Sequence, residues 1–185
     1  MTTPRRPVNA LRTIYRGRIF RVEREHVTLP HGVALTMDVI RHRGSVVLLP
    51  QPEAGQIVLI RQYRHVIRRS IWELPAGTLE PGEQPARAAR RECEEETGWR
   101  PRRVVRLGEY YATPGYCDER MIFYACLGLA RPSRPARGDD DEHILPQVFT
   151  LRQAWALVRR GEVVDMKTVL GLAIISGRVP AAARP

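Results

Sequence analysis

The feature that most constrains this chain is a run of glutamates at residues 92–96, where four of five positions carry a carboxylate. Like charges three and four residues apart repel each other on a helix, so an ordinary surface helix avoids this arrangement. On a helix Glu92, Glu95 and Glu96 share one face, whereas Glu94 projects from the opposite side. The pattern therefore favours a helix with an acidic face that something else neutralises.

Three carboxylates on one helix face predict a site for a hard divalent cation. Mg²⁺ and Mn²⁺ prefer oxygen ligands, and they typically bridge protein carboxylates to the phosphates of a substrate. A metal held there could activate a water molecule and absorb charge that develops on phosphoryl oxygens. The alternative for such a run is a solvated acidic face, and the run alone does not decide between the two.

Local signals predict where the helices and strands begin and end. We expect the glutamate-rich helix to run from Pro85 to Thr97, because proline is tolerated in a first turn and Gly98 can end a helix. Turn residues near Pro30 predict a β-hairpin between Ile19 and His42. We expect residues 46–49 and 57–63 to pair as antiparallel strands, further strands at residues 104–107, 121–129 and near Val148, and two C-terminal helices, the second around residues 167–175.

Composition excludes several other classes of protein. The net charge is +10, but the cations are almost all arginine, Lys167 is the only lysine, and they are scattered, so binding of nucleic acid is not expected. No stretch approaches the roughly 20 apolar residues that span a membrane, and we expect a cytoplasmic protein. The three cysteines form no C-x-x-C pair, which argues against a zinc site.

The residues around the glutamate run resemble the Nudix box. That pattern is G-x5-E-x7-R-E-U-x-E-E-x-G-U, where U is a bulky apolar residue. The chain matches every fixed position, at Gly77, Glu83, Arg91, Glu92, Glu95, Glu96 and Gly98. Cys93 and Trp99 stand at U positions where an aliphatic residue is commoner, and both can still pack inward. The resemblance decides in favour of a metal site over a solvated acidic face.

Membership of that family would imply an α/β fold, namely an α/β/α sandwich with a mixed sheet. It further implies that Glu92, Glu95 and Glu96 bind Mg²⁺, or Mn²⁺, together with the backbone carbonyl of Ala76. Arg91 would orient the carboxylates. Glu83, which is outside the acidic face, would be a structural or orienting partner, and Gly77 and Gly98 would serve backbone geometry.

Further segments resemble the ADP-ribose pyrophosphatase subgroup of that family. They are residues 61–64, 72–77 and 114–120, and Pro114, sixteen residues beyond Gly98, is the position that usually marks the subgroup. The resemblance implies hydrolysis of a nucleoside diphosphate substrate, ADP-ribose, to AMP and ribose 5-phosphate. Enzymes that act on GDP-mannose and other nucleotide sugars share parts of this pattern, so other substrates stay open.

The resemblance also suggests residues for catalysis and substrate binding. A general base is expected on the loop after the last long strand, where we prefer Glu142 over its neighbours at residues 139–141. Arg64 is expected to bind a phosphate and Glu119 the terminal ribose, with a structural ion pair as the equal alternative for each. Pro114 and Trp72 complete the expected substrate site, Trp72 as one of several aromatics that could stack on adenine.

The resemblance divides the chain into three parts. Residues 1–43 are expected to be a β-rich segment exchanged between the subunits of a homodimer, 44–180 a Nudix hydrolase domain and 181–185 a tail. Two other functions stay open: a Nudix hydrolase acting on another nucleotide sugar, a dinucleotide or capped RNA, and a nucleotide sensor without turnover. Such a sensor would be expected to lack the metal-binding carboxylates, which this chain retains.

Overall fold

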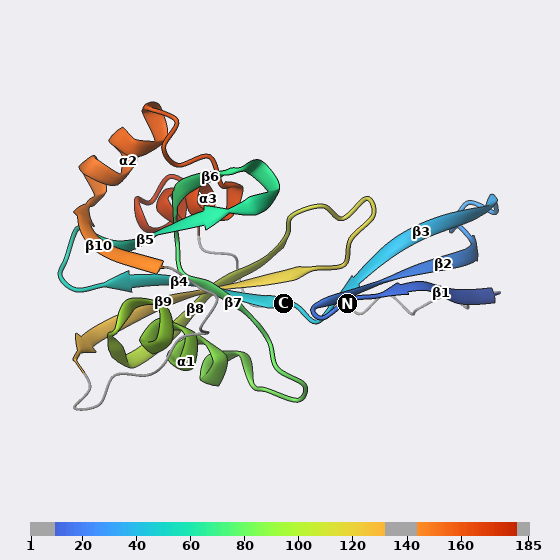
Figure 1. Cartoon of the computed structure of the whole chain (residues 1–185), viewed down its shortest axis with the longest axis horizontal. Helices are drawn as coiled ribbons and strands as arrows, with labels where there is room; N and C mark the ends of the chain where they lie inside the picture. The colour runs from blue at the N-terminus through green and yellow to red at the C-terminus, as the bar shows by residue number, and fades with distance from the viewer. Residues whose placement is uncertain (1–9, 132–143, 181–185) are drawn as a thin grey trace.

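Among the residues that the structure describes, two β-sheets and three α-helices form the body of the protein, and a third sheet projects from it (Figure 1). The computed structural model describes residues 10–131 and 144–180. Within these ranges no helix combines the length and apolar character needed to cross a bilayer. The expected class, an α/β fold with a mixed sheet, is confirmed.

The mixed sheet has four strands in the order β7-β4-β9-β8. Strand β4 (Ser45–Gln51) lies at its centre, parallel to β9 (Arg120–Ala130) and antiparallel to the short β7 (Ala76–Thr78). Strand β8 (Arg100–Tyr111) pairs with β9 in the antiparallel direction. A continuous apolar run, as in β4, is typical of a strand that is buried on both faces.

The second sheet consists of β5 (Gln56–Arg64) between β10 (Ile144–Thr150) and β6 (Arg69–Glu73), all antiparallel. The short 3-10 helix η1 (His65–Ile67) joins β5 to β6. The expected antiparallel pairing of residues 46–49 with residues 57–63 is therefore wrong, because these strands belong to different sheets. Strand β4 takes β7 and β9 as partners, and both come from later in the chain.

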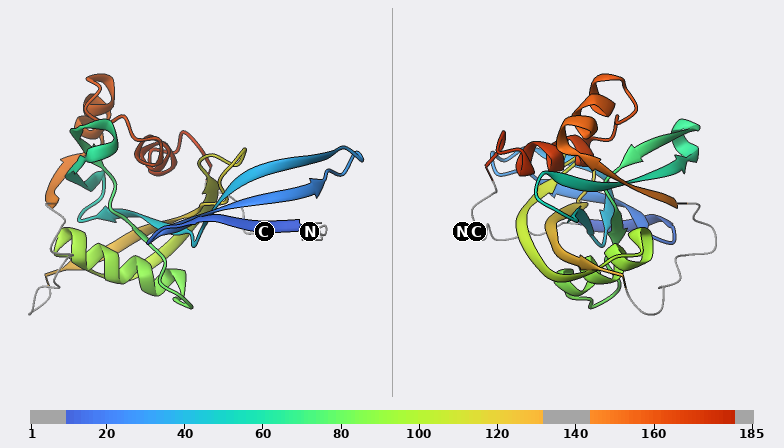
Figure 2. Two further views of the ribbon diagram at one scale, coloured as in Figure 1. Left: turned by 45° about the vertical axis from the view of Figure 1, so that its right-hand side comes forward. Right: turned by 90° about the vertical axis from the view of Figure 1, so that its left-hand side faces the viewer.

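Two apolar clusters fix the layers of the body. On one face of the mixed sheet, Val46 and Leu48 pack with Ala88, Ala89 and Cys93 of helix α1 (Pro85–Thr97). On the other face, side chains of β4 and β5 pack with those of α2 (Leu151–Arg159) and α3 (Met166–Ile175). Figure 2 shows α1 on one side of the sheet and α2 and α3 on the other.

Helix α1 has the bounds expected from the sequence. Pro85 occupies its first position, where the missing N–H costs no hydrogen bond. Gly98 ends it in the left-handed conformation, with φ of 70°, and donates its N–H to the carbonyl of Glu94 at 2.9 Å. Cys93 is fully buried in the core beside α1, whereas Trp99 is half-buried and its ring lies under the guanidinium of Arg131.

The projecting sheet contains β1 (Ala10–Arg16), β2 (Phe20–Thr28) and β3 (Ala34–His42). The hairpin β2–β3 is confirmed, while β1 was not expected. Backbone hydrogen bonds join this sheet to the loop before β9: Ile40 N–H donates to Tyr116 O at 2.7 Å, and Asp118 N–H donates to Ile40 O at 3.1 Å. The Asp118 carboxylate also accepts from the backbone N–H of His42 at 2.8 Å.

Candidate active site

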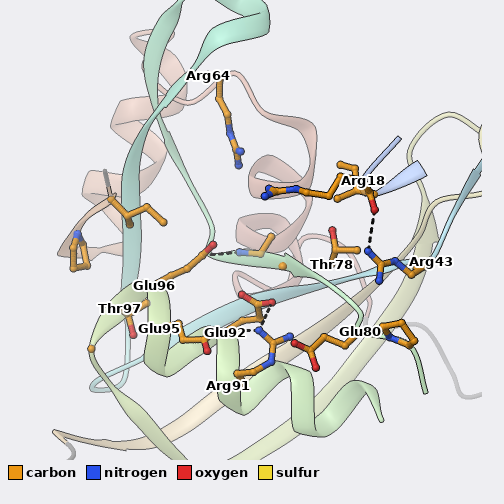
Figure 3. A pocket seen from close by; sticks show the side chains of 17 residues that line it. Arg18, Arg43, Arg64, Thr78, Glu80, Arg91, Glu92, Glu95, Glu96 and Thr97 are labelled. Carbon is orange, nitrogen blue, oxygen red and sulfur yellow. Dashed lines mark hydrogen bonds and ion pairs between the residues drawn. The ribbon is translucent and has the colours of Figure 1, made fainter. Parts of the chain in front are cut away.

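A cavity of about 1000 Å³ lies between the acidic face of α1 and the root of the projecting sheet. Its floor carries Glu92, Glu95 and Glu96 of α1, with Ala76 and Gly77 of β7 beside them. Arg18, Arg43 and Arg64 line it from other elements, and Figure 3 shows these three arginines across the cavity from α1. The cavity thus has an acidic floor and a basic wall.

The three carboxylates of the floor are held by donors from the protein. Glu96, of which 8% is exposed, accepts a hydrogen bond from the backbone N–H of Ala76 at 3.0 Å. The Nη1 atom of Arg91 lies 2.8 Å from Glu92 Oε1 and 2.9 Å from Glu95 Oε2. Arg91 therefore offsets the repulsion between two of the three glutamates.

Arg91 is itself oriented by Glu83. Its Nε donates to Glu83 Oε1 at 3.1 Å and its Nη2 to Glu83 Oε2 at 2.9 Å, so two parallel hydrogen bonds fix the plane of the guanidinium. The hydrogen bond with Arg91 lowers the pKa of Glu83, and the same bond raises the pKa of Arg91. Glu83 contacts this arginine and does not line the cavity.

Gly77 allows α1 to approach β7 closely. A Cβ atom at this position would overlap the carboxylate of Glu92. The glycine in the box thus leaves room for the carboxylate of a metal-binding candidate, and it does not serve an unusual backbone angle.

The donors on the floor fit a divalent cation in chemistry, since they are carboxylate oxygens beside the backbone of Ala76. They do not form a ready-made cage: among residues 10–131 and 144–180, no three His, Cys, Asp or Glu side chains are grouped to hold a metal ion. The three glutamates share a face as expected, but Arg91 and the N–H of Ala76 engage them. A cation would therefore compete with Arg91 for carboxylate oxygens.

The basic wall combines side chains that are distant in sequence. Arg43 follows β3, and its Nη2 donates to the carbonyl of Arg18, in the turn between β1 and β2, at 3.4 Å. Arg64 ends β5 and donates two hydrogen bonds to Glu73, at 2.6 and 3.0 Å. Burial opposes the charged form of Arg64, but the hydrogen bond with Glu73 and the charges of Glu73, Glu96 and Asp165 together outweigh it and raise the pKa of Arg64.

Three of the expected substrate-binding residues do not line this cavity in a single chain. Glu119 accepts a hydrogen bond from Ser45 Oγ at 3.0 Å. Pro114 lines a separate cavity of about 240 Å³ beside β3. Trp72 packs edge-to-face on Phe149 of the core, with ring centroids 4.9 Å apart. The expected general base, Glu142, lies outside the described residues.

Sequence reasoning missed several residues that the fold brings to the site. Arg18 and Arg43 carry no local signal, because scattered arginines are common throughout this chain. The Nζ atom of Lys167 lies 2.5 Å from Oε2 of Glu73, and each of these two residues stands out in the sequence. Glu73 is a carboxylate in an apolar segment and Lys167 is the only lysine of the chain.

Comparisons with known proteins agree with this geometry. A family model described as the NUDIX domain matches residues 41–169. An ADP-ribose pyrophosphatase of Bacillus subtilis (strain 168) is 34% identical over 159 residues, 86% of each chain. Another, from Mycobacterium tuberculosis (strain ATCC 25618 / H37Rv), is 32% identical over 174 residues, 94% of this chain and 84% of that protein. A solved structure titled as an ADP compounds hydrolase shares the fold, with a TM-score of 0.79 and 21% identity over 96% of both chains. The chain therefore belongs to the Nudix family and is a Nudix hydrolase.

Proposed function

We propose that this chain hydrolyses the pyrophosphate linkage of ADP-ribose to AMP and ribose 5-phosphate, by attack of water on phosphorus. The observation that carries the proposal is the cavity of about 1000 Å³ with carboxylates on one side and arginines on the other. A diphosphate placed between them meets a cation site and charged donors at once. The names of the relatives support ADP-ribose as the substrate.

In this proposal Glu92, Glu95, Glu96 and the backbone carbonyl of Ala76 bind Mg²⁺, with Mn²⁺ as the alternative. When bound, the metal supplies an activated water and stabilises charge on the phosphoryl oxygens. Arg91, fixed by Glu83, orients the carboxylates and offsets the repulsion between Glu92 and Glu95.

The chain's other residues orient the substrate and remove a proton. Arg64 binds a phosphate oxygen from the basic wall, where Arg18 and Arg43 add positive charge. Glu142 is our candidate for the general base that takes the proton of the attacking water. It precedes Ile144 by two positions, and Ile144 lines the cavity, which supports a base supplied by this part of the chain.

We also propose that two copies form a homodimer by exchanging residues 1–43, with residues 44–180 as the Nudix domain and 181–185 as a tail. Large apolar side chains on β1 and in the turn after it support the proposal, because Leu11, Tyr15 and Ile19 are 53%, 55% and 42% exposed. Contributions of Glu119, Pro114 and Trp72 to substrate binding stay predictions, as does a cytoplasmic location.

The test is to incubate the purified protein with Mg²⁺, or with Mn²⁺, and ADP-ribose, GDP-mannose, NADH, diadenosine polyphosphates or capped RNA, and to identify the products by chromatography. Metal-dependent release of AMP and ribose 5-phosphate from ADP-ribose is the expected result. Preference for another compound would discard ADP-ribose and keep the chemistry. No turnover of any compound with either metal would favour a nucleotide sensor.

A further inference from the structure

Next to the basic wall, four charged side chains from three elements form one connected group, which we call the charged quartet. It consists of Arg64 at the end of β5, Glu73 at the end of β6, and Asp165 and Lys167 at the start of α3. Lys167 Nζ donates to Glu73 Oε2 at 2.5 Å and to Asp165 Oδ2 at 2.9 Å. Glu73 in turn accepts both hydrogen bonds from Arg64.

The quartet is neutral as a whole and runs from the interior to the cavity. Side-chain exposure is 2% for Glu73 and 9% for Lys167, and it rises to 41% for Arg64, which lines the cavity. Burying the Glu73 carboxylate is costly unless cations and donors surround it. Arg64 and Lys167, which both donate to this carboxylate, meet that requirement.

Arg64 keeps part of its guanidinium available to the cavity. Glu73 engages Nε and Nη2, while Nη1 has no hydrogen-bond partner among residues 10–131 and 144–180. Figure 3 shows the side chain reaching from β5 toward the middle of the cavity. The fork of two hydrogen bonds fixes the plane of the guanidinium, and so fixes the direction in which Nη1 points.

Besides Lys167, a second contact attaches the start of α3 to the body. Thr168 Oγ1 accepts a hydrogen bond from the backbone N–H of Leu74 at 2.7 Å and donates to Asp165 Oδ2 at 2.6 Å. Asp165 also caps the helix by accepting from the N–H of Thr168 at 3.1 Å. What Lys167 adds is a second positive charge beside Glu73 and Asp165.

We propose that Lys167 and Glu73 are positioning residues for Arg64. Glu73 sets the orientation of the guanidinium, and Lys167 balances the carboxylates of Glu73 and Asp165 so that the charge of Arg64 acts on an anion in the cavity. Without Lys167, Arg64 alone would face two carboxylates, and its attraction for a phosphate would be largely cancelled. The identity of that anion as a substrate diphosphate rests on the proposed function.

The test compares four variants with the wild-type protein. Lys167→Met removes the charge, Lys167→Arg keeps it, and Lys167→Met with Asp165→Asn restores neutrality without restoring the bond to Glu73. Arg160→Met is the matched control, since it removes an exposed ion pair with Glu162 before the same helix. Each protein is assayed for KM and kcat with ADP-ribose, for binding of inorganic pyrophosphate with Mg²⁺ by calorimetry, and for thermal unfolding.

We expect Lys167→Met to weaken pyrophosphate binding and raise KM by about tenfold, the effect of losing one charge-assisted hydrogen bond, with a smaller change in kcat. The double variant should recover most of this loss, Lys167→Arg should resemble the wild type, and Arg160→Met should change nothing. Recovery by Asp165→Asn is the signature of charge balance, because a purely structural role of Lys167 would leave the double variant at least as impaired.

The opposite results overturn the proposal. They are an unchanged affinity for pyrophosphate in Lys167→Met, or a loss that the double variant does not recover although it unfolds at the wild-type temperature. If Lys167→Met fails to fold, the double variant decides: an affinity for pyrophosphate near that of the wild type supports the proposal, and a weakened affinity in a folded double variant overturns it. Absence of ADP-ribose hydrolysis by the wild type would remove the proposed function but leave the pyrophosphate measurements to decide on the quartet, and a wild type that does not bind pyrophosphate would refute it.

Discussion

The two sides of α1 carry the same residue type in different surroundings. On the outer side, Glu94 accepts two hydrogen bonds from Arg100, at 2.6 and 2.9 Å, and Arg100 is 63% exposed. On the cavity side, Glu96 is buried against the backbone of Ala76, and Glu92 and Glu95 share a single arginine. The glutamate run is therefore not one functional unit, and position on the helix decides the role of each member.

The difference between the sides has an energetic meaning. The arginine of the outer pair is exposed, so solvent screens the pair and it contributes little to folding. The inner side concentrates three carboxylates beside one cation, which opposes folding through mutual repulsion. Such an arrangement is expected where a site must leave its carboxylates available to a ligand, at some loss of stability.

The largest expected effect is on the inner side. Glu96→Gln should lower kcat for ADP-ribose by about two orders of magnitude or more, since loss of even a partner of a metal ligand costs about 10- to 100-fold. The amide retains an acceptor for the N–H of Ala76, so the protein should fold normally. Steady-state kinetics over a range of Mg²⁺ concentrations, with thermal unfolding as the control, measure this. Near-normal turnover would remove Glu96 from the proposed metal site.

A second change acts on the inner side without altering any charge. Gly77→Ala places a methyl group where the carboxylate of Glu92 lies, so that carboxylate or α1 itself must move. A displacement of about 1 Å can cost about 100-fold in rate, and we expect a loss of that order in kcat. Gly115→Ala is the matched control, because a Cβ there meets no atom within 4 Å. Equal activities of the two variants would contradict the close packing of Gly77 on Glu92.

Local signals explain what the sequence predicted well. Pro85 and Gly98 act within one turn of the helix ends, so the bounds of α1 followed from them. The pairing of strands is a long-range property, and the expectation that β4 and β5 pair failed for that reason. Strand β4 is buried on both faces and is held by β7 and β9, whose residues lie far along the chain.

The site also combines features that local signals predict with features that depend on long-range contacts. The shared face of Glu92, Glu95 and Glu96 follows from helical periodicity alone. The basic wall does not follow from periodicity. Its residues Arg18, Arg43 and Arg64 come from three separate parts of the chain, and only the fold brings them to one cavity. Helical spacing also says nothing about a hydrogen-bond donor from another element. The hydrogen bond from the backbone N–H of Ala76 to Glu96 was therefore not predicted.

An intermediate effect is expected from a change at Glu83, which holds Arg91 on the cavity side of α1. Arg91 lowers the pKa of Glu83 below its ordinary value of 4.5, so this carboxyl binds a proton more readily in the unfolded chain than in the folded one. Its contribution to stability is therefore complete above about pH 4.5 and is lost as the pH falls through the lowered folded pKa.

Glu83→Gln should cost about 1–3 kcal/mol of unfolding free energy near pH 7, by weakening the hold on Arg91, and should flatten the dependence of stability on pH in acid. Urea unfolding from about pH 7 to about pH 3 measures both. An unchanged slope would mean that the pair does not control this transition.

The smallest effect is expected on the outer side, with Glu94→Gln. The variant loses the charge that pairs with Arg100, but the exposure of Arg100 already weakens that pair through solvent screening, and the backbone carbonyl of residue 94 still accepts from Gly98. We expect kcat and Mg²⁺ dependence to match the wild type, and any small loss of stability to disappear at high salt. Kinetics and unfolding at low and high ionic strength, beside Glu96→Gln, measure the contrast. A fall in kcat comparable to that of Glu96→Gln would show that the catalytic face of α1 has been assigned to the wrong side.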